Sequence, residues 1–453
     1  GGDPEAKAQA EAETLADRVD TFSRAFLGLT AACARCHNHK FDPITAQDYY
    51  AIAGIFKNSR NAKHPLVPQA TVDAYNSAQK AIGEKNQAIN KHLEAEAKRI
   101  GVERGKVEES LDDDARGRLA EMRAELKRLK ESAPPMYEIA HVLRDGANQD
   151  MHLALRGDLR KQGELVPRRF FQIVAGEQAT PYSDGSGRRE LARSVTSPDN
   201  PLTPRVIVNR VWAWHFGRGL VGTPSNFGVL GEAPTHPQLL DWLAADFVEN
   251  GWSLKRLHRQ IVLSRTWQMS SRFSADKFAI DGDNRLLWRM NPRRLEVEAW
   301  RDALLAVTGE LDRSRGGAPA GEILRSKRRT LYATISRTGD RFESDGFLRL
   351  FDFPAAVATS ARRETSTVPQ QYLFMMNSPF MGDRARELGS QLHQMQAPLP
   401  DRITETYQRL YSRPPEPAEI ELGIRWVGDS PGPENWQQYA QVLLSAHEFI
   451  QIQ

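Results

Sequence analysis

The sequence of 453 residues is poor in cysteine, in net charge and in long apolar runs. With only two cysteines, it cannot build a disulfide framework or a four-thiolate zinc site. A formal net charge of +3 argues against a dedicated nucleic-acid-binding protein, which would carry a stronger basic stripe. No apolar run approaches a membrane span, and no P-loop, Rossmann fingerprint, G-x-S-x-G or H-E-x-x-H motif occurs. A candidate functional site must therefore be sought in a motif other than these.

Both cysteines lie in one pentapeptide, Cys33-Ala34-Arg35-Cys36-His37, which is a C-x-x-C-H motif. Two thiols one helical turn apart can take up the two vinyl groups of haem c, and the adjacent histidine supplies an axial nitrogen to the iron. We therefore predict one covalent haem c, held by Cys33 and Cys36, with His37 as the proximal iron ligand.

Three other interpretations of the motif stay open. A C-x-x-C pair can be a redox dithiol, although that function is typical of a thioredoxin-like context and does not need the histidine. Zinc could bind Cys33, Cys36, His37 and His39, but adjacent residues such as Cys36 and His37 point in different directions on a helix. The thiols could also be simple packing residues.

Hydrophobic periodicity predicts a mainly α fold. Residues 11–32 are expected to form a helix that runs directly into the motif, and a second helix is expected after Thr45, which forms a capping box with Asp48. Residues 76–132 combine mixed charge with apolar stripes at helical spacing, which predicts a helical hairpin with a solvated charged face. Two apolar helices around the motif would form a cytochrome-c-like haem region.

Composition divides the chain into four parts. We predict the haem region over residues 1–75, the hairpin insertion over 76–132, an irregular, β-containing connector over 133–187, and a larger, mostly helical domain with a few short strands over 188–453. In the last part, alternation over residues 328–335 predicts a strand.

The residues around the motif and in the second half resemble a known family. Phe26-Leu27-Gly28-Leu29-Thr30, the haem motif and His39-Lys40-Phe41-Asp42-Pro43-Ile44 resemble the cytochrome-c-like domain of large planctomycete secreted proteins. In that family the haem-motif domain is followed by a domain of unknown function. Stretches of the second half are similar to that domain, among them Asn209-Arg210-Val211-Trp212, Ser366-Thr367-Val368-Pro369-Gln370-Gln371 and Met376-Asn377-Ser378-Pro379-Phe380.

The resemblance implies an exported haem c protein, periplasmic or otherwise extracytoplasmic. Its relatives are linked to redox chemistry in the breakdown of complex carbohydrates, and they usually carry more sequence before this point. The resemblance therefore implies that the chain starts inside the first domain. Residues 1–4 are polar and do not resemble a signal peptide, so we expect a mature form or a fragment.

Several side chains are expected to contact the haem. His39, Phe41 and Tyr49 lie close to the motif in sequence, and His39 is too near His37 to reach the opposite haem face. We expect His39 to bond a propionate, the Asp42 carboxylate or a backbone carbonyl instead.

The distal ligand decides what the iron does. A second strong ligand gives an electron carrier, whereas an open site permits chemistry at the iron. We predict His141 or His215 in this position.

An arginine-rich stretch of the second half suggests a site for an anionic ligand. Clustered guanidinium groups suit carboxylates or sulfates, and the residues are Arg337, Arg341, Arg362 and Arg363. Acidic residues nearby could instead neutralise this positive charge.

The leading hypothesis is an exported monohaem c protein that moves electrons to or from a substrate or partner at its second domain. The partner would be a redox protein or a carbohydrate, whose anionic group the arginines would hold. A haem c-dependent oxidoreductase is the enzymatic version. The alternatives are a pure electron-transfer module and a polysaccharide-binding scaffold in which the haem is structural.

Overall fold

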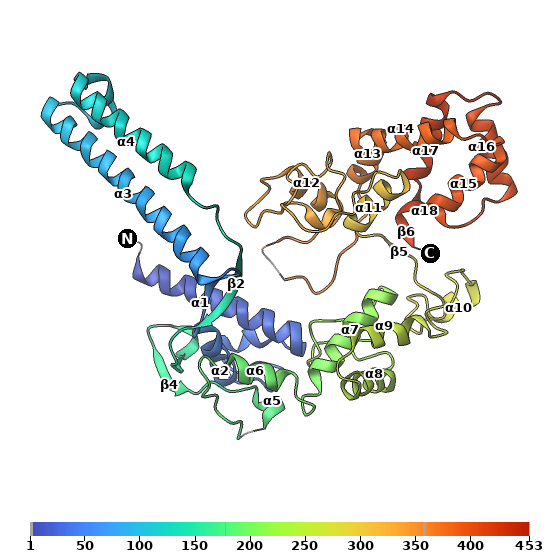
Figure 1. Ribbon diagram of the computed structural model, residues 1–453. Coiled ribbons are helices and arrows are strands. Elements are labelled where there is room, and N and C mark those ends of the chain that lie inside the picture. The colour runs from blue at the N-terminus through green and yellow to red at the C-terminus, as the bar shows by residue number, and fades with distance from the viewer. Residues whose placement is uncertain (1–2, 177, 357–358, 453) are drawn as a thin grey trace.

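The computed structural model describes residues 3–176, 178–356 and 359–452. As predicted, the fold is mainly α, with helices joined by irregular segments and small two-stranded sheets (Figure 1). No helix within these residues has the length and apolar character needed to cross a membrane.

The first helix does not run into the C-x-x-C-H motif, so the prediction of one helix over residues 11–32 was wrong. Helix α1 (Pro4–Phe22) passes into a π-helical turn, η1 (Ser23–Leu27), which ends at Gly28. Gly28 adopts a left-handed conformation with φ of 62°, and a Cβ there would lie 2.8 Å from the Phe227 ring. The motif follows on a separate 3₁₀ helix, η2 (Ala31–Arg35).

The capping box predicted for the second helix is confirmed. Helix α2 (Ala46–Lys57) begins after Thr45, whose hydroxyl accepts the Asp48 N–H while the Asp48 carboxylate accepts the Thr45 N–H. Helix α2 is buried along almost its whole length and packs with α1 in one apolar core, to which Phe170 and Phe171 also belong.

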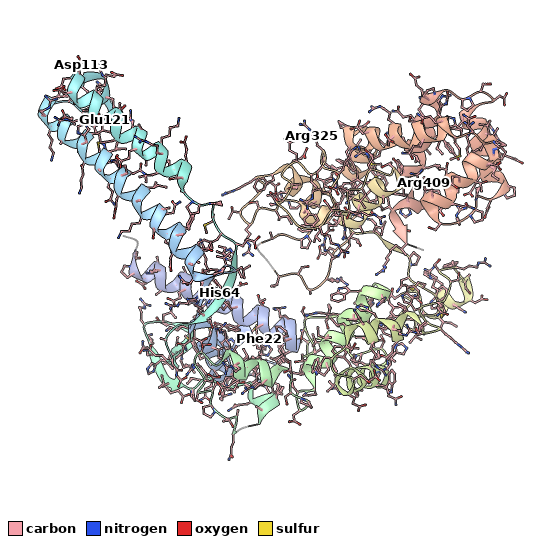
Figure 2. All side chains as sticks on the ribbon, in the orientation of Figure 1. Phe22, His64, Asp113, Glu121, Arg325 and Arg409 are labelled. Atoms are coloured by element: carbon pink, nitrogen blue, oxygen red, sulfur yellow. The ribbon has the colours of Figure 1, made fainter. Side chains whose placement is uncertain are left out.

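The predicted hairpin is present and projects from the rest of the molecule (Figure 1). It consists of α3 (Gln69–Ile100), the 3₁₀ turn η3 (Arg104–Ser110) and α4 (Asp113–Ser132), which share a small apolar core of their own. Figure 2 places Asp113 at its far end and His64 near its base. Strands β1 (Ser59–Pro65) and β2 (Ile139–Asp145) pair antiparallel at that base.

Short elements connect the hairpin to the second half. They are β3 (Met151–Ala154), the turn η4 (Leu155–Gly157), β4 (Gln162–Val166), α5 (Gln172–Ala175) and α6 (Arg188–Val195). Strands β3 and β4 pair antiparallel and cover α2. Leu191 and Val195 of α6 pack into the first core, beside the helices that flank the motif.

Two further cores make up the rest of the described chain. One is built on α7 (Leu202–Phe216), α8 (Pro237–Glu249) and α9 (Leu254–Val262), followed by the short α10 (Ala275–Ile280). The other gathers α11 (Val297–Val307), α12 (Glu343–Leu350), α13 (Pro369–Asn377), α14 (Pro379–Gln394), α15 (Leu399–Tyr411), α16 (Pro417–Val427), α17 (Pro433–Leu444) and α18 (His447–Ile450). Strands β5 (Arg293–Arg294) and β6 (Gln451–Ile452) pair beside it.

The strand predicted over residues 328–335 does not form. This segment holds the 3₁₀ turn η5 (Thr330–Tyr332) and makes only isolated bridges to Asp312 and Ala320. The polar groups of Thr330 are satisfied without a neighbouring strand. Its N–H and its hydroxyl both donate to the Asp302 carboxylate at 2.7 Å. A side chain of α11 therefore takes the place of a partner strand.

Candidate functional site

Both thiols of the motif lie on the surface. Cys33 lies within η2 and Cys36 caps the end of that helix, and both are exposed and unbridged. The two cysteines are three residues apart, and about three residues make one turn of a 3₁₀ helix. This is the spacing that attachment to one planar ring requires.

The His37 imidazole has one ring nitrogen engaged and one left over. The side chain is exposed, and Nδ1 lies 2.7 Å from the carbonyl oxygen of Asn38. A carbonyl oxygen only accepts, so Nδ1 carries the proton and Nε2 keeps its lone pair. The hydrogen bond from Nδ1 to Asn38 therefore fixes the tautomer in which Nε2 can bind a metal. Asn38 is itself held, because its Oδ1 accepts the Ala46 N–H at 2.9 Å.

A glycine from a distant segment packs against the motif. Gly157, in the turn between β3 and β4, has φ of +77°, and a Cβ at this position would lie 2.5 Å from the Cys36 Sγ. Only glycine meets both demands without strain. The Tyr50 hydroxyl donates to the carbonyl oxygen of Arg35 at 3.2 Å, so α2 also contacts the motif.

The predicted contact residues differ in exposure. Tyr49 is buried and meets Tyr50 edge to face at 5.0 Å, and burial, with the nearby Cys36 adding to it, raises the pKa of Tyr49 to about 12. Phe41 is exposed, and the Lys40 ammonium lies 5.2 Å from its ring centre. Tyr49 thus belongs to the core beneath the motif, whereas Phe41 offers an aromatic face at the surface.

His39 shapes the loop that follows the motif. Its Nδ1 accepts the Asp42 N–H at 2.8 Å, so Nε2 carries the proton and donates to the Thr30 hydroxyl at 3.1 Å. Nδ1 also lies 3.5 Å from the Asp42 carboxylate, but in this tautomer it carries no proton to donate to that expected partner. With both nitrogens engaged and the ring buried, His39 positions the loop and leaves His37 as the exposed imidazole.

The same loop joins the motif to the second half of the chain. The Asp42 carboxylate is buried and accepts the Val229 N–H at 2.8 Å, while the Phe227 N–H donates to the Gly28 carbonyl at 2.7 Å. The Arg210 guanidinium donates to the carbonyl oxygens of Ala25 and Arg24 at 2.5 and 2.9 Å. We call these contacts the junction.

Comparisons with known families match both sides of the junction. The family model PSD1: Protein of unknown function (DUF1553) matches residues 187–427, more than half of the chain. The chain belongs to this family. The model PSCyt2: Protein of unknown function (DUF1549) matches residues 2–61, so the two matches are the domain pair to which the sequence is similar. No curated protein and no solved structure matches the chain.

The two candidate distal ligands lie in different parts of the fold. His141 is exposed on β2, where it pairs with Lys63. His215 lies on α7 of the PSD1 region, and its Nε2 is 2.8 Å from Nδ1 of His258. Burial, His258 and Arg293 together lower the pKa of His215. The interactions of both histidines lie outside the C-x-x-C-H segment, and the distal assignment stays a prediction.

The predicted arginine set of the PSD1 region splits into two kinds. Arg363 is engaged, because it pairs with Glu298 at 2.5 Å and its guanidinium lies 4.7 Å from the Phe353 ring centre. Arg337, Arg341 and Arg362 are exposed, and no carboxylate within the described ranges forms an ion pair with them. These three are the members of the set that remain available to an anionic ligand.

Among the residues described, no group of three or more His, Cys, Asp or Glu side chains is placed to hold a metal ion. A c-type haem needs no such group of protein ligands, because the porphyrin supplies the equatorial nitrogens and the protein supplies only axial ligands.

Gly157 and the junction were not found from the sequence. Nothing near Leu155-Arg156-Gly157 points to the motif, since the contact depends on how β3 and β4 fold over α2. The junction left a weak signal, because Gly28 and Asp42 both lie in stretches that carry the family resemblance. Their shared role became visible only in three dimensions.

Proposed function

We propose that this chain is an extracytoplasmic c-type haem protein with one covalent haem, which moves electrons to or from a substrate or partner protein at its PSD1 region. A carbohydrate-linked oxidoreductase is the concrete version. The observation that carries the proposal is the exposure of three groups within one turn of chain: the thiols of Cys33 and Cys36 and the imidazole of His37, whose Nδ1 is engaged by a carbonyl oxygen and whose Nε2 is left to bind a metal.

The residues present fit a covalent haem. Both sulfur atoms are accessible for thioether bonds, and Gly157 leaves the space beside Cys36 that any side chain would fill. The Nδ1–H of His37 is anchored on Asn38, which raises the basicity of Nε2. When bound, the haem would supply a one-electron centre, and these residues would hold it at the surface, where a partner can approach.

The deciding experiment measures whether haem is attached. The chain is exported in a host that matures c-type cytochromes, and the purified protein is examined by intact mass and by its pyridine haemochrome spectrum. We expect the mass of the polypeptide plus one haem and a Soret band. A protein with the mass of its amino acids alone and no Soret absorption would contradict the proposal.

Variants distinguish covalent attachment of the haem from ligation of its iron. The double variant Cys33→Ala/Cys36→Ala is expected to lose covalent haem. His37→Ala is expected to keep the thioethers but to shift the Soret and redox behaviour. His64→Ala is the matched control, because His64 is also exposed but lies on β1 at the base of the hairpin. If His64→Ala and His37→Ala give the same spectrum as the parent, His37 is not the ligand.

A pure electron carrier is the second candidate, and the exposed position of the motif favours it. The two candidates differ at the iron. Binding of CO to the reduced protein and of cyanide to the oxidised protein indicates an open site, whereas two strong protein ligands resist both. For the anionic partner, Arg337→Gln/Arg341→Gln is expected to weaken binding of a sulfated polysaccharide, with Arg325→Gln as a control on another exposed arginine.

A further inference from the structure

We propose that the PSD1 region forms part of the haem site, through a loop at residues 226–231 whose Val229 and Leu230 side chains contact the porphyrin ring. The inference rests on the proposed function, because its occupant is the covalent haem of Cys33 and Cys36. It adds that the second region supplies side chains to the cofactor itself, besides any substrate or partner that it binds.

Two neighbouring apolar side chains of this loop are exposed to solvent. The exposed fraction is 69% for Val229 and 62% for Leu230. Single exposed apolar residues are common on protein surfaces, whereas apolar residues that gather in one place indicate a contact with another group.

The fold keeps this loop in one conformation. The Thr223 hydroxyl donates to the carbonyl oxygen of Asn226 at 2.7 Å, and the Gly231 N–H donates to the carbonyl oxygen of Gly228 at 2.8 Å. A Cβ on Gly231 would clash with the Asn226 carbonyl oxygen, so only glycine fits at this position. The backbone therefore holds the two apolar side chains outward.

The junction fixes the loop beside the C-x-x-C-H motif. The Val229 N–H donates to the Asp42 carboxylate at 2.8 Å, and a Cβ on Gly228 would clash with the same carboxylate. The Asp42 N–H in turn donates to Nδ1 of His39 at 2.8 Å, within the segment that directly follows the motif. Figure 1 shows the end of α1 beside α7, the helix that precedes the loop. Two hydrogen bonds therefore connect the loop to a residue next to the motif.

Two further segments expose apolar side chains near the thiols. Phe41 is 45% exposed and directly precedes Asp42. Leu155 is 48% exposed and lies two residues before Gly157, the glycine that packs against the Cys36 Sγ. Exposed apolar residues of three segments thus gather around one motif, as a bound apolar ring requires.

The charges of these segments favour haem as the occupant. Lys40 and Arg156 are exposed and form no ion pair within the described ranges, and the nearby Asp158 pairs with Arg160 at 3.0 Å instead. Arg156 has φ of +58°, and strained residues of this kind cluster at binding sites. Haem combines an apolar ring with two propionate carboxylates, so one attached group satisfies both the apolar side chains and these cations.

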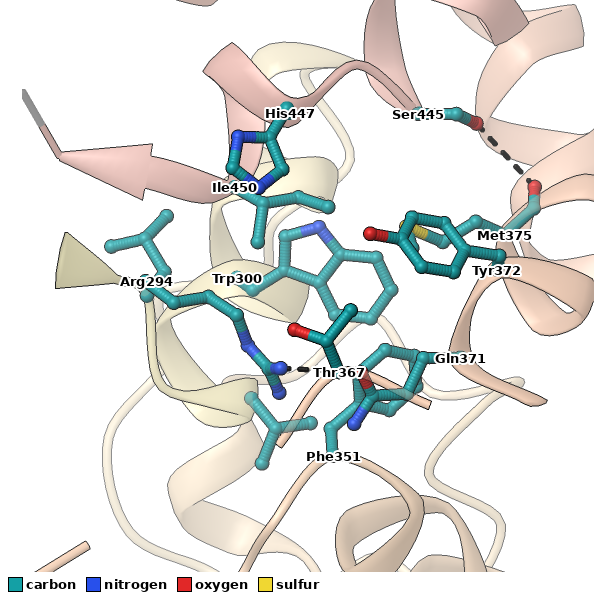
Figure 3. A pocket seen from close by; sticks show the side chains of 12 residues that line it. Arg294, Trp300, Phe351, Thr367, Gln371, Tyr372, Met375, Ser445, His447 and Ile450 are labelled. Carbon is teal, nitrogen blue, oxygen red and sulfur yellow. Dashed lines mark hydrogen bonds between the residues drawn. The ribbon is translucent and has the colours of Figure 1, made fainter. Parts of the chain in front are cut away.

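A pocket enclosed by the PSD1 region is too small to seat such a ring. The side chains around Trp300 leave a cavity volume of about 40 Å³ (Figure 3), which is room for about three water molecules. A macrocycle attached to Cys33 and Cys36 must therefore rest on surface side chains, and the junction brings Val229 and Leu230 to the motif.

Methyl NMR of the haem-loaded protein tests the contact without an activity assay. Leucine and valine methyl groups are labelled with ¹³C, and the two signals are assigned from Val229→Ala and Leu230→Ala. We expect both signals to move from their positions in the haem-free Cys33→Ala/Cys36→Ala protein, because a porphyrin ring strongly shifts nearby methyl signals. The methyl signals of Leu422, which is 58% exposed on α16, should stay in place.

The double variant Val229→Ser/Leu230→Ser measures what the contact does to the iron. Apolar cover raises the reduction potential of a haem, because it disfavours the additional positive charge of ferric iron. We expect the variant to keep its covalent haem, by intact mass, and to have a lower reduction potential than the parent. Leu422→Ser is the matched control and should leave the potential unchanged.

The outcomes distinguish this inference from the function on which it rests. A protein without haem by intact mass contradicts the proposed function and removes the occupant. Covalent haem with unmoved Val229 and Leu230 signals, or with an unchanged potential in the double variant, overturns the inference and leaves the function intact. Signals that move only as the protein concentration rises would assign these side chains to contact with a second copy of the chain, and would also overturn it.

Discussion

Replacing Gly157 with alanine tests the contact between the β3–β4 turn and the haem motif. Gly157 has φ of +77°, and the new Cβ would lie 2.5 Å from the Cys36 Sγ and 3.5 Å from its Cβ. The first distance is shorter than real Cβ contacts allow, whereas the second is ordinary van der Waals contact. The clash therefore falls on the sulfur atom alone.

The expected cost has two parts. A residue with a side chain in the left-handed region costs about 1–2 kcal/mol. The Cys36 thiol is exposed and can move aside, which costs about 0.5–1.5 kcal/mol for an off-rotamer side chain. We expect Gly157→Ala to lower the local free energy of unfolding by about 1.5–3.5 kcal/mol in total.

Two comparisons isolate the second part. Gly101 has nearly the same φ, +79°, but no atom lies within 4 Å of a Cβ placed there, so Gly101→Ala reports the backbone cost alone. Cys36→Ala removes the sulfur atom, so the cost of Gly157→Ala should shrink by about 0.5–1.5 kcal/mol in that background. The measurement is hydrogen exchange of peptides that cover residues 31–57, with 69–101 for the control.

The reasoning fails if Gly157→Ala costs no more than Gly101→Ala. It fails equally if the cost of Gly157→Ala is the same with and without the Cys36 sulfur, because the clash would then have another origin. In the haem-loaded protein we expect the same substitution to reduce the yield of covalent haem, which the pyridine haemochrome spectrum measures.

Asp48→Asn should lower the free energy of unfolding by about 3–5 kcal/mol, measured in urea, because Arg169 would stay buried without the carboxylate now 2.6 Å away. Asp42→Asn should weaken the charged acceptor of the Val229 N–H by about 1.5–3 kcal/mol and speed proteolysis of the loop around it. His215 has a pKa below 6.5 when folded, so the unfolded chain binds more protons near that pH. Stability should therefore fall as the pH drops through 6.5, and His215→Gln should flatten this dependence.

Matched controls accompany these three predictions. Asp199→Asn changes an exposed carboxylate whose only recorded side-chain partner, among described residues, is Ser197, and it should leave both urea stability and proteolysis nearly unchanged. His64→Gln removes an exposed histidine and should keep the pH profile of the parent. An Asp48→Asn variant as stable as Asp199→Asn, or a His215→Gln profile as steep as that of the parent, would contradict the corresponding prediction.

Local signals in the sequence predicted local structure well. The box formed by Thr45 and Asp48 marked the start of α2, and apolar residues at helical spacing marked both arms of the hairpin. Each of these features is decided within a few residues, so the chain order contains the information.

Features that depend on distant segments were missed or misread. The π-helical turn before Gly28 changes the path of the chain without altering the apolar spacing that predicted a continuous helix. The alternating residues around Thr330 do not pair as a strand, because the N–H and hydroxyl of Thr330 donate to the carboxylate of Asp302 on α11. For the candidate site, the motif indicated the sulfur atoms and His37, but the contact with Gly157 required the folded chain.

The junction bears on how the two halves can be inherited or engineered. A cut near residue 187 would leave Asp42 and the Gly28 carbonyl on one fragment and their amide partners, with Arg210, on the other. It would also strip Leu191 and Val195 from the core that they complete. Recombination that replaces one half with the corresponding half of another protein must therefore preserve the junction contacts, or both halves must be exchanged as one unit.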